Sequence, residues 1–91
     1  MAVTIRIPTQ LRTLAAGASE VSVEAATVSD ALKALNAQHA GFDERLFDDK
    51  GELRRFVNVF VADEDIRFMN GIDTELTDGT VVSIIPAVAG G

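Results

Sequence analysis

The sequence predicts an α+β domain in which one main helix covers one face of a mixed β-sheet. Apolar residues recur at every second position in several short segments, which is the pattern of strands with one buried face. One segment before the middle of the chain has the helical period instead, and 91 residues suit a single domain. The predicted order is ββαββ with a short fourth strand, so the helix must cover one face of the sheet and leave the other in water.

The chain opens with a predicted β-hairpin. Residues 3–7 alternate between apolar and polar, and Pro8 ends this strand because proline has no N–H to donate. A turn at residues 15–17 precedes a second alternating segment, residues 20–24, which we expect to pair with the first.

The main helix is predicted to begin at Val28. Its apolar face recurs at i, i+4, i+7 and i+11, in Val28, Leu32, Leu35 and His39. Thr27 is the predicted N-cap, with Asp30 in the capping-box position, and Gly41 suits the left-handed C′ residue that ends a helix.

The second half of the chain is predicted to return to strands. Residues 42–47 form one short helical turn, and a polar surface loop follows at residues 48–51. Residues 56–61 read as a strong strand, bounded by an acidic turn at residues 62–65 and followed by a short extended piece at residues 66–68.

The last strand is predicted at residues 81–85, after two turns that contain glycine, and Pro86 ends it. We therefore assign residues 1–86 to the domain and residues 87–91 to a flexible C-terminal diglycine tail. The five tail residues are small and uncharged and can extend about 16–18 Å. The two glycines carry no Cβ, so the backbone can enter a narrow channel, although a frayed end is the simpler alternative.

Alternation also predicts a partly apolar outer face of the sheet. If Val57, Val59 and Val61 face the helix, their neighbours must point outward. The outward residues that we expect to dock partners are Arg6, Phe56, Phe60 and Ile85. The alternative is that one of the two phenylalanines packs beneath the segment from residue 42 to residue 55.

The composition argues against several classes of function. Eight Lys and Arg against 14 Asp and Glu give a net charge of -6, which repels nucleic acid and anionic membranes. The chain has no cysteine, which excludes thiolate chemistry and fits a reducing compartment, and no apolar stretch is long enough to span a membrane. We therefore expect a cytoplasmic protein that is a monomer on its own.

The residue inventory also argues against an enzyme and against a metal site. His39 is the only histidine, and its place near the end of the helix is explained by packing and by the helix dipole. The acidic runs at residues 43–52 and 63–65 lack the spacing of a calcium-binding loop. They form either a solvated surface or one that a basic partner recognises.

The end of the chain carries a resemblance to a known family. Residues 84–91, with residues 78–81 before them, resemble the C-terminal signature of the ThiS/MoaD sulfur carrier proteins, which have the ubiquitin-like β-grasp fold. Residues 3–9 and 53–67 resemble the cysteine-biosynthesis sulfur carriers of actinobacterial type, the CysO group. The resemblance covers essentially the whole chain.

This resemblance implies a carrier on which other proteins act. An E1-like adenylating enzyme would use ATP and Mg²⁺ to convert the Gly91 carboxylate into an acyl-adenylate, and a sulfur donor would then leave a thiocarboxylate. Val88, Ala89 and Gly90 would thread the active sites of the partners. For the CysO group it implies sulfur delivery to an aminoacrylate derived from O-phosphoserine, on a pyridoxal-phosphate cysteine synthase. A JAMM-type zinc metalloprotease would then release cysteine. The chain itself is expected to bind no cofactor and no metal.

Three alternatives remain open at the level of sequence. The first is the small subunit of molybdopterin synthase, which also carries a thiocarboxylate. The second is a ubiquitin-like modifier that joins Gly91 to lysines of other proteins. The third is a β-grasp interaction domain with an inert tail.

Overall fold

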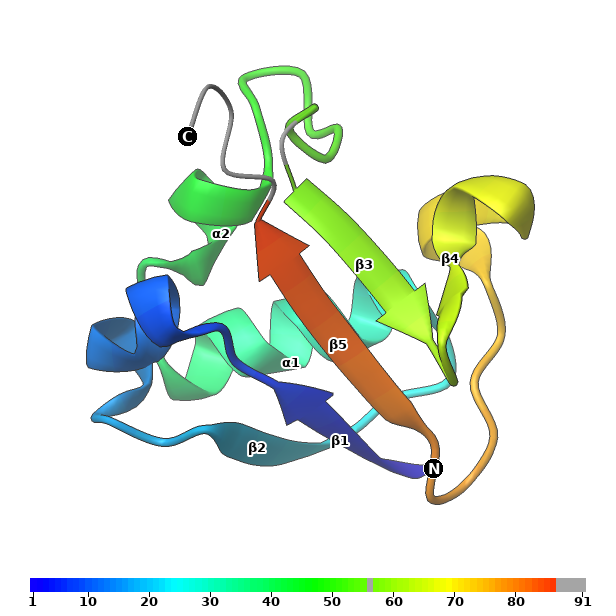
Figure 1. Cartoon of the computed structure of the whole chain (residues 1–91), viewed down its shortest axis with the longest axis horizontal. Coiled ribbons are helices and arrows are strands. Elements are labelled where there is room, and N and C mark those ends of the chain that lie inside the picture. The colour runs from blue at the N-terminus through cyan, green and yellow to red at the C-terminus, as the bar shows by residue number, and fades with distance from the viewer. Residues whose placement is uncertain (56, 87–91) are drawn as a thin grey trace.

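The computed structural model describes residues 1–55 and 57–86 of the chain. In this part, five strands and several short helices form one sheet and its cover (Figure 1). In chain order the elements are β1 (Ala2–Arg6), η1 (Thr9–Ala15), β2 (Glu20–Glu24), α1 (Val28–Gln38), α2 (Phe42–Leu46), β3 (Val57–Val61), β4 (Glu64–Asp65), η2 (Ile66–Phe68), η3 (Gly71–Asp73) and β5 (Val81–Pro86), where η marks a 3-10 helix.

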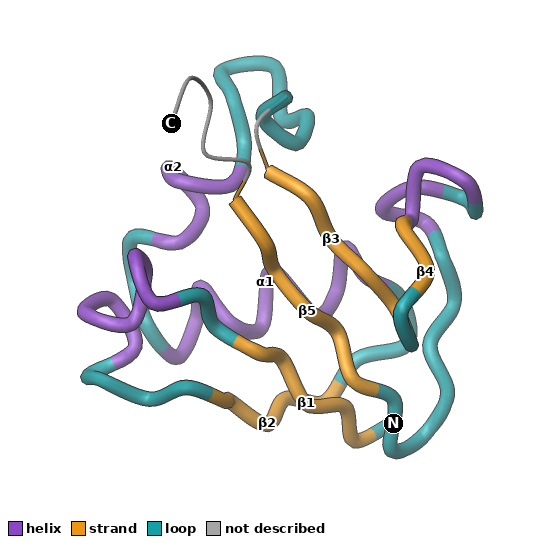
Figure 2. The backbone as a smooth tube through the Cα atoms, viewed as in Figure 1, coloured by secondary structure: helices purple, strands orange, loops and turns teal. Residues whose placement is uncertain are grey.

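The sheet is mixed, with the strand order β2-β1-β5-β3-β4. The last strand, β5, is therefore the central one; it runs parallel to β1 and antiparallel to β3. Helix α1 crosses behind the sheet, as Figures 1 and 2 show. This arrangement confirms the predicted α+β class, and β4 adds a fifth strand to the ββαββ order.

The core lies between the sheet and α1. Val57, Val59 and Val61 are buried, as the alternation of β3 predicts. They are joined from the other strands and from α1 by Val3, Ile5, Val21, Val23, Val28, Ala31, Leu32, Leu35, Val82 and Ile84. Since the inner faces of β1, β2, β3 and β5 are filled in this way, the outer face is left for solvent or for a partner.

The two ends of α1 differ in how well the sequence predicts them. At the start, Thr27 Oγ1 accepts a hydrogen bond from the backbone N–H of Asp30 at 3.2 Å, which confirms the predicted N-cap. At the end, the helix stops at Gln38 with His39 as an extended C-cap, so the prediction of Gly41 as the C′ residue is wrong. Gly41 does have a positive φ of 110°, but it uses this conformation as the N-cap of α2.

Helix α2 belongs to the core, although its sequence pattern is weak. Phe42 and Leu46 are both fully buried, and the Asp43 N–H donates to Asn36 Oδ1 of α1 at 2.9 Å. The predicted helical turn is thus confirmed. It is more than a surface excursion, because it extends the buried face of α1.

The hairpin after β3 is tighter than predicted. Ala62 and Asp63 both have positive φ, at 50° and 71°, so two residues reverse the chain and β4 pairs at once with the end of β3. The predicted turn at residues 62–65 therefore contains β4, and residues 66–68 form the 3-10 helix η2 where an extended piece was predicted.

Candidate functional site

One row of side chains crosses the outer face of the whole sheet. The strand registers place Glu20, Arg6, Ser83, Phe60 and Asp65 opposite one another, from β2 through to β4. Arg6 is exposed and Phe60 is half-buried. Two of the residues predicted for docking therefore lie in the same row, separated by the small side chain of Ser83.

Ile85 lies on the same outer face, one step nearer the end of β5. Its side chain is 48% exposed, and its register partner on β3 is Asn58. Arg6, Phe60 and Ile85 thus share the face opposite α1; we call it the outer face. The other predicted site residues lie outside the described residues, namely Phe56, Val88, Ala89, Gly90 and Gly91.

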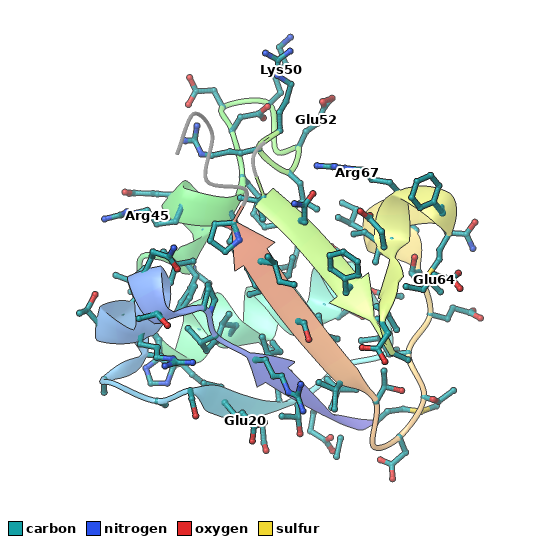
Figure 3. All side chains as sticks on the ribbon, in the orientation of Figure 1. Glu20, Arg45, Lys50, Glu52, Glu64 and Arg67 are labelled. Carbon is teal, nitrogen blue, oxygen red and sulfur yellow. The ribbon has the colours of Figure 1, made fainter. Side chains whose placement is uncertain are left out.

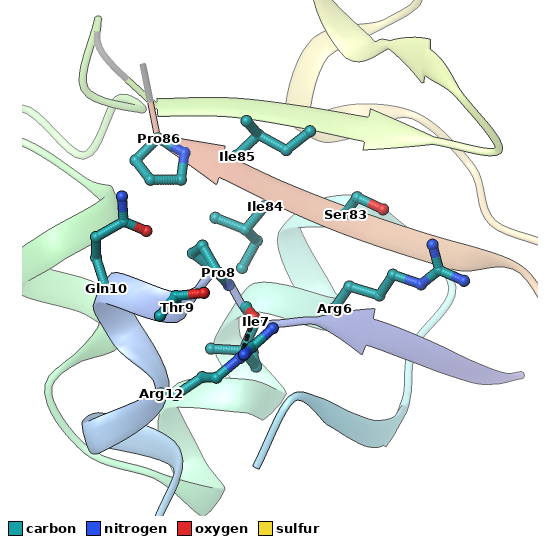
Figure 4. Close-up of a pocket in the computed structure, with 10 residues that line it drawn as sticks. All are labelled: Arg6, Ile7, Pro8, Thr9, Gln10, Arg12, Ser83, Ile84, Ile85 and Pro86. Atoms are coloured by element: carbon teal, nitrogen blue, oxygen red, sulfur yellow. Dashed lines mark hydrogen bonds between the residues drawn. The ribbon is translucent and has the colours of Figure 1, made fainter. Parts of the chain in front are cut away.

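A groove of about 410 Å³ runs along the outer face where β5 ends. Figure 4 shows Arg6 and Arg12 on the side of β1 and η1, and Ile85 and Pro86 on the side of β5. The side chain of Arg12 is held in place by another residue of the groove, because its Nε donates a hydrogen bond to the Ile7 carbonyl oxygen at 3.1 Å. Sequence reasoning missed Arg12, since η1 was not predicted and no alternation places its side chain.

The groove exists because two prolines end the pairing of β1 with β5. The last parallel register pair is Arg6 with Ser83. The next rung would need an N–H from Pro8 to the carbonyl of Ile84, and the rung after it an N–H from Pro86, but proline has none. The two strands therefore part at this point, and the space between them opens beside the residue that precedes the tail.

Arg67 holds the start of β3, which lies on the other side of Pro86 from the groove. Its Nη2 donates to the carbonyl oxygens of Arg55 at 3.1 Å and Val57 at 3.2 Å, and Val57 is the register partner of Pro86. Figure 3 shows Arg67 extending from η2 toward the beginning of β3. Because β4 has only two residues, this side chain takes over the edge of β3 that β4 does not reach.

The described residues include no candidate metal centre and no candidate membrane-spanning helix. In residues 1–55 and 57–86, no group of three or more His, Asp and Glu side chains could hold a metal ion. His39 caps α1, on the side of the sheet away from the outer face. Within the same part of the chain, no helix is both long enough and apolar enough to cross a membrane.

The family of the chain follows from its sequence taken as a whole. Residues 5–91 match the model of the ThiS family, so the match includes the tail. The chain belongs to the ThiS family. It is 46% identical to the sulfur carrier protein CysO of Mycobacterium tuberculosis over a 93-residue alignment that covers all of both proteins.

Two further comparisons extend this result. A chain in the crystal structure of the Amycolatopsis orientalis BexX/CysO complex superposes with a TM-score of 0.91 at 45% identity, covering 98% of this chain and 99% of that one. Small archaeal modifier protein 3 of Haloferax volcanii is 42% identical over 66 residues, which is 72% of this chain and 71% of that protein. This ThiS-family chain thus has the ubiquitin-like β-grasp fold and is a CysO homologue. Its relatives support the role of a small sulfur carrier protein.

Proposed function

We propose that this chain carries sulfur as a thiocarboxylate on Gly91 and donates it for the synthesis of cysteine. The observation that carries the proposal is where the diglycine lies. The central strand ends at Pro86, and the family match continues from there through Gly90 and Gly91. A short tail that follows a well-anchored strand suits delivery of its terminal carboxylate into another protein.

The proposed loading takes two steps in the active site of an E1-like enzyme. A carboxylate oxygen of Gly91 attacks the α-phosphorus of ATP, bound with Mg²⁺, and pyrophosphate leaves. The resulting acyl-adenylate has a good leaving group, so a sulfur donor attacks its carbonyl carbon and expels AMP. The Gly91 thiocarboxylate remains, and no cysteine in the chain can intercept it.

The 46% sequence identity to CysO, which extends over the full chain, supports cysteine synthesis as the pathway that uses the sulfur. In the proposed step the thiocarboxylate sulfur adds to the aminoacrylate that a pyridoxal-phosphate enzyme forms from O-phosphoserine. An S-to-N acyl shift then leaves cysteine in amide linkage to Gly91. Hydrolysis of this amide by a JAMM-type zinc metalloprotease in the cytoplasm releases cysteine and regenerates the carboxylate.

We propose that the outer face docks these partners while the tail enters their active sites. Arg6, Phe60 and Ile85 lie on it together, and Phe56 belongs to the same alternating set. An exposed apolar side chain next to a charged one is typical of the centre and rim of a transient interface. Phe60→Ala should weaken binding of both the activating enzyme and the acceptor. Unchanged affinity for both enzymes would show that Phe60 does not contribute to docking.

The test of the whole proposal is the intact mass of the protein after incubation with ATP, Mg²⁺, a sulfide source and the E1-like enzyme. The expected result is a gain equal to the difference between sulfur and oxygen, confined to the C-terminal peptide. A variant that lacks Gly91 should fold normally and gain nothing. If wild type gains no sulfur from an enzyme that loads another carrier, the proposal is wrong.

A second candidate is protein modification, which the similarity to a small archaeal modifier protein favours. Here a lysine of another protein attacks the activated Gly91, and an isopeptide bond replaces the thiocarboxylate. The discriminating measurement is mass spectrometry of cell extract for lysines that carry the C-terminal peptide of this chain.

A further inference from the structure

The groove beside β5 is a positive site on an acidic protein. Two arginines line it, Arg6 from β1 and Arg12 from η1, and its lining residues include no Asp or Glu. The chain as a whole has a net charge of -6, and a separate hollow is lined by four acidic residues and one arginine, namely Asp43, Glu44, Asp48, Asp49 and Arg54. An incoming acidic group is therefore repelled over much of the surface and attracted to this groove.

Both guanidinium groups are held through Nε, and within residues 1–55 and 57–86 their terminal nitrogens have no hydrogen-bond partner. Arg6 Nε lies 3.4 Å from Glu20 Oε2, and Arg12 Nε donates to the Ile7 carbonyl at 3.1 Å. Each of these interactions uses Nε, so the terminal nitrogens keep donors for a further acceptor. Positioned guanidinium groups of this kind favour carboxylates, which accept two hydrogen bonds side by side.

The position of the groove indicates which part of a partner protein lies against it. Pro86 lines the groove and is also the residue from which the tail departs. When the tail enters a channel in another protein, the rim of that channel must lie against the surface around Pro86. The groove therefore faces the rim of the channel in any protein that receives the tail.

We propose that this groove receives an acidic side chain of the activating enzyme, placed at the mouth of the channel that takes the tail. This inference rests on the proposed function, in which the activating enzyme is the first protein to take the tail. The carboxylate is bound by Arg6 and Arg12 together, while the apolar part of the outer face packs beside it. The contact holds the domain at the mouth of the channel and is the same before and during loading, so it contributes to binding and leaves the chemical step unaffected.

The test compares Arg6→Gln, Arg12→Gln and the double variant with wild type. Two quantities are measured at low and at high salt: the dissociation constant for the activating enzyme without ATP, and the KM and kcat of sulfur loading. Each neutralised arginine is expected to raise the dissociation constant and the KM about 2- to 5-fold. The double variant should have a higher dissociation constant and KM than either single variant. These differences from wild type should shrink at high salt, and kcat should be unchanged.

Three matched variants separate recognition from folding. Glu20→Gln removes the ion-pair partner of Arg6 but leaves the positive charge of Arg6 in place, so the activating enzyme should bind as tightly as it binds wild type, or more tightly. Arg12→Lys keeps the charge but loses the paired donors and the Nε hydrogen bond to the Ile7 carbonyl, so it should recover only part of the affinity that Arg12→Gln loses. Lys33→Gln removes a positive charge from α1, on the other side of the sheet, and should bind like wild type.

Several outcomes would overturn the proposal. They are wild-type affinity of the double variant, a loss in Glu20→Gln equal to that in Arg6→Gln, an equal loss in Lys33→Gln, and no binding of wild type to the activating enzyme. The proposed function fails separately. Suppose that wild type binds the activating enzyme in a way that depends on the two arginines but gains no sulfur. The groove would then still be the docking site, and the proposal that Gly91 carries a thiocarboxylate would be wrong.

Discussion

Replacing Ile85 with alanine should weaken the docking of a partner and leave folding nearly intact. Ile85 is 48% exposed on the outer face of β5. Full burial of an isoleucine side chain is worth about 1.5–3 kcal/mol, so covering its exposed half in a complex is worth about 0.7–1.5 kcal/mol. The dissociation constant for the activating enzyme should therefore rise roughly 3- to 12-fold.

Its neighbour in the same strand is the natural control. Ile84 is only 2% exposed and faces α1, so Ile84→Ala should lower the free energy of unfolding by about 2–5 kcal/mol. Titration of the activating enzyme gives the affinity of each folded variant, and denaturation in urea gives its stability. The reasoning is refuted if Ile85→Ala binds with wild-type affinity, or if it loses as much stability as Ile84→Ala.

Three further predictions concern stability, and urea denaturation checks each. Thr27→Ala removes the N-cap of α1 and should cost about 0.5–2 kcal/mol; no loss would mean that the hydrogen bond at 3.2 Å contributes nothing. Phe42→Ala should cost about 3–5 kcal/mol, because its side chain is fully buried, whereas Phe68→Ala should cost almost nothing at 83% exposure. Equal losses would contradict the placement of α2 in the core. Ala62→Gly should stabilise the hairpin by up to about 1 kcal/mol, since Ala62 adopts a left-handed φ of 50°, and a destabilised variant would show that this strain is absent.

The strands and α1 could be predicted because their periodicity is strong. The alternation in β3 correctly placed its three valines on the inner face, and Thr27 marked the start of α1. Helices η1 and α2 carry few apolar residues each, so their burial depends on contacts with other elements, such as that between Asp43 of α2 and Asn36 of α1. Periodicity within a short window cannot report such contacts.

The candidate site was predictable only in part, for a related reason. Alternation placed Arg6 and Ile85 on the outer face, because each belongs to a strand with one buried side. Arg12 and Arg67 lie on 3-10 helices, and each acts on a backbone carbonyl elsewhere in the chain. The sequence does show Pro8 and Pro86, but only the parallel register of β1 and β5 shows that these two prolines open one groove.

The central place of β5 also governs how the domain responds to force. Any protein that draws the tail into a channel pulls on β5 along its length, and so loads its pairing with β1 and β3 in shear. Five residues of β3 and three of β1 share that tension, so rungs on both sides must slip together before the strand can leave. A strand at the edge of the sheet, paired on one side only, would peel away more easily. The central position of β5 therefore helps the domain to stay folded when a partner holds its tail.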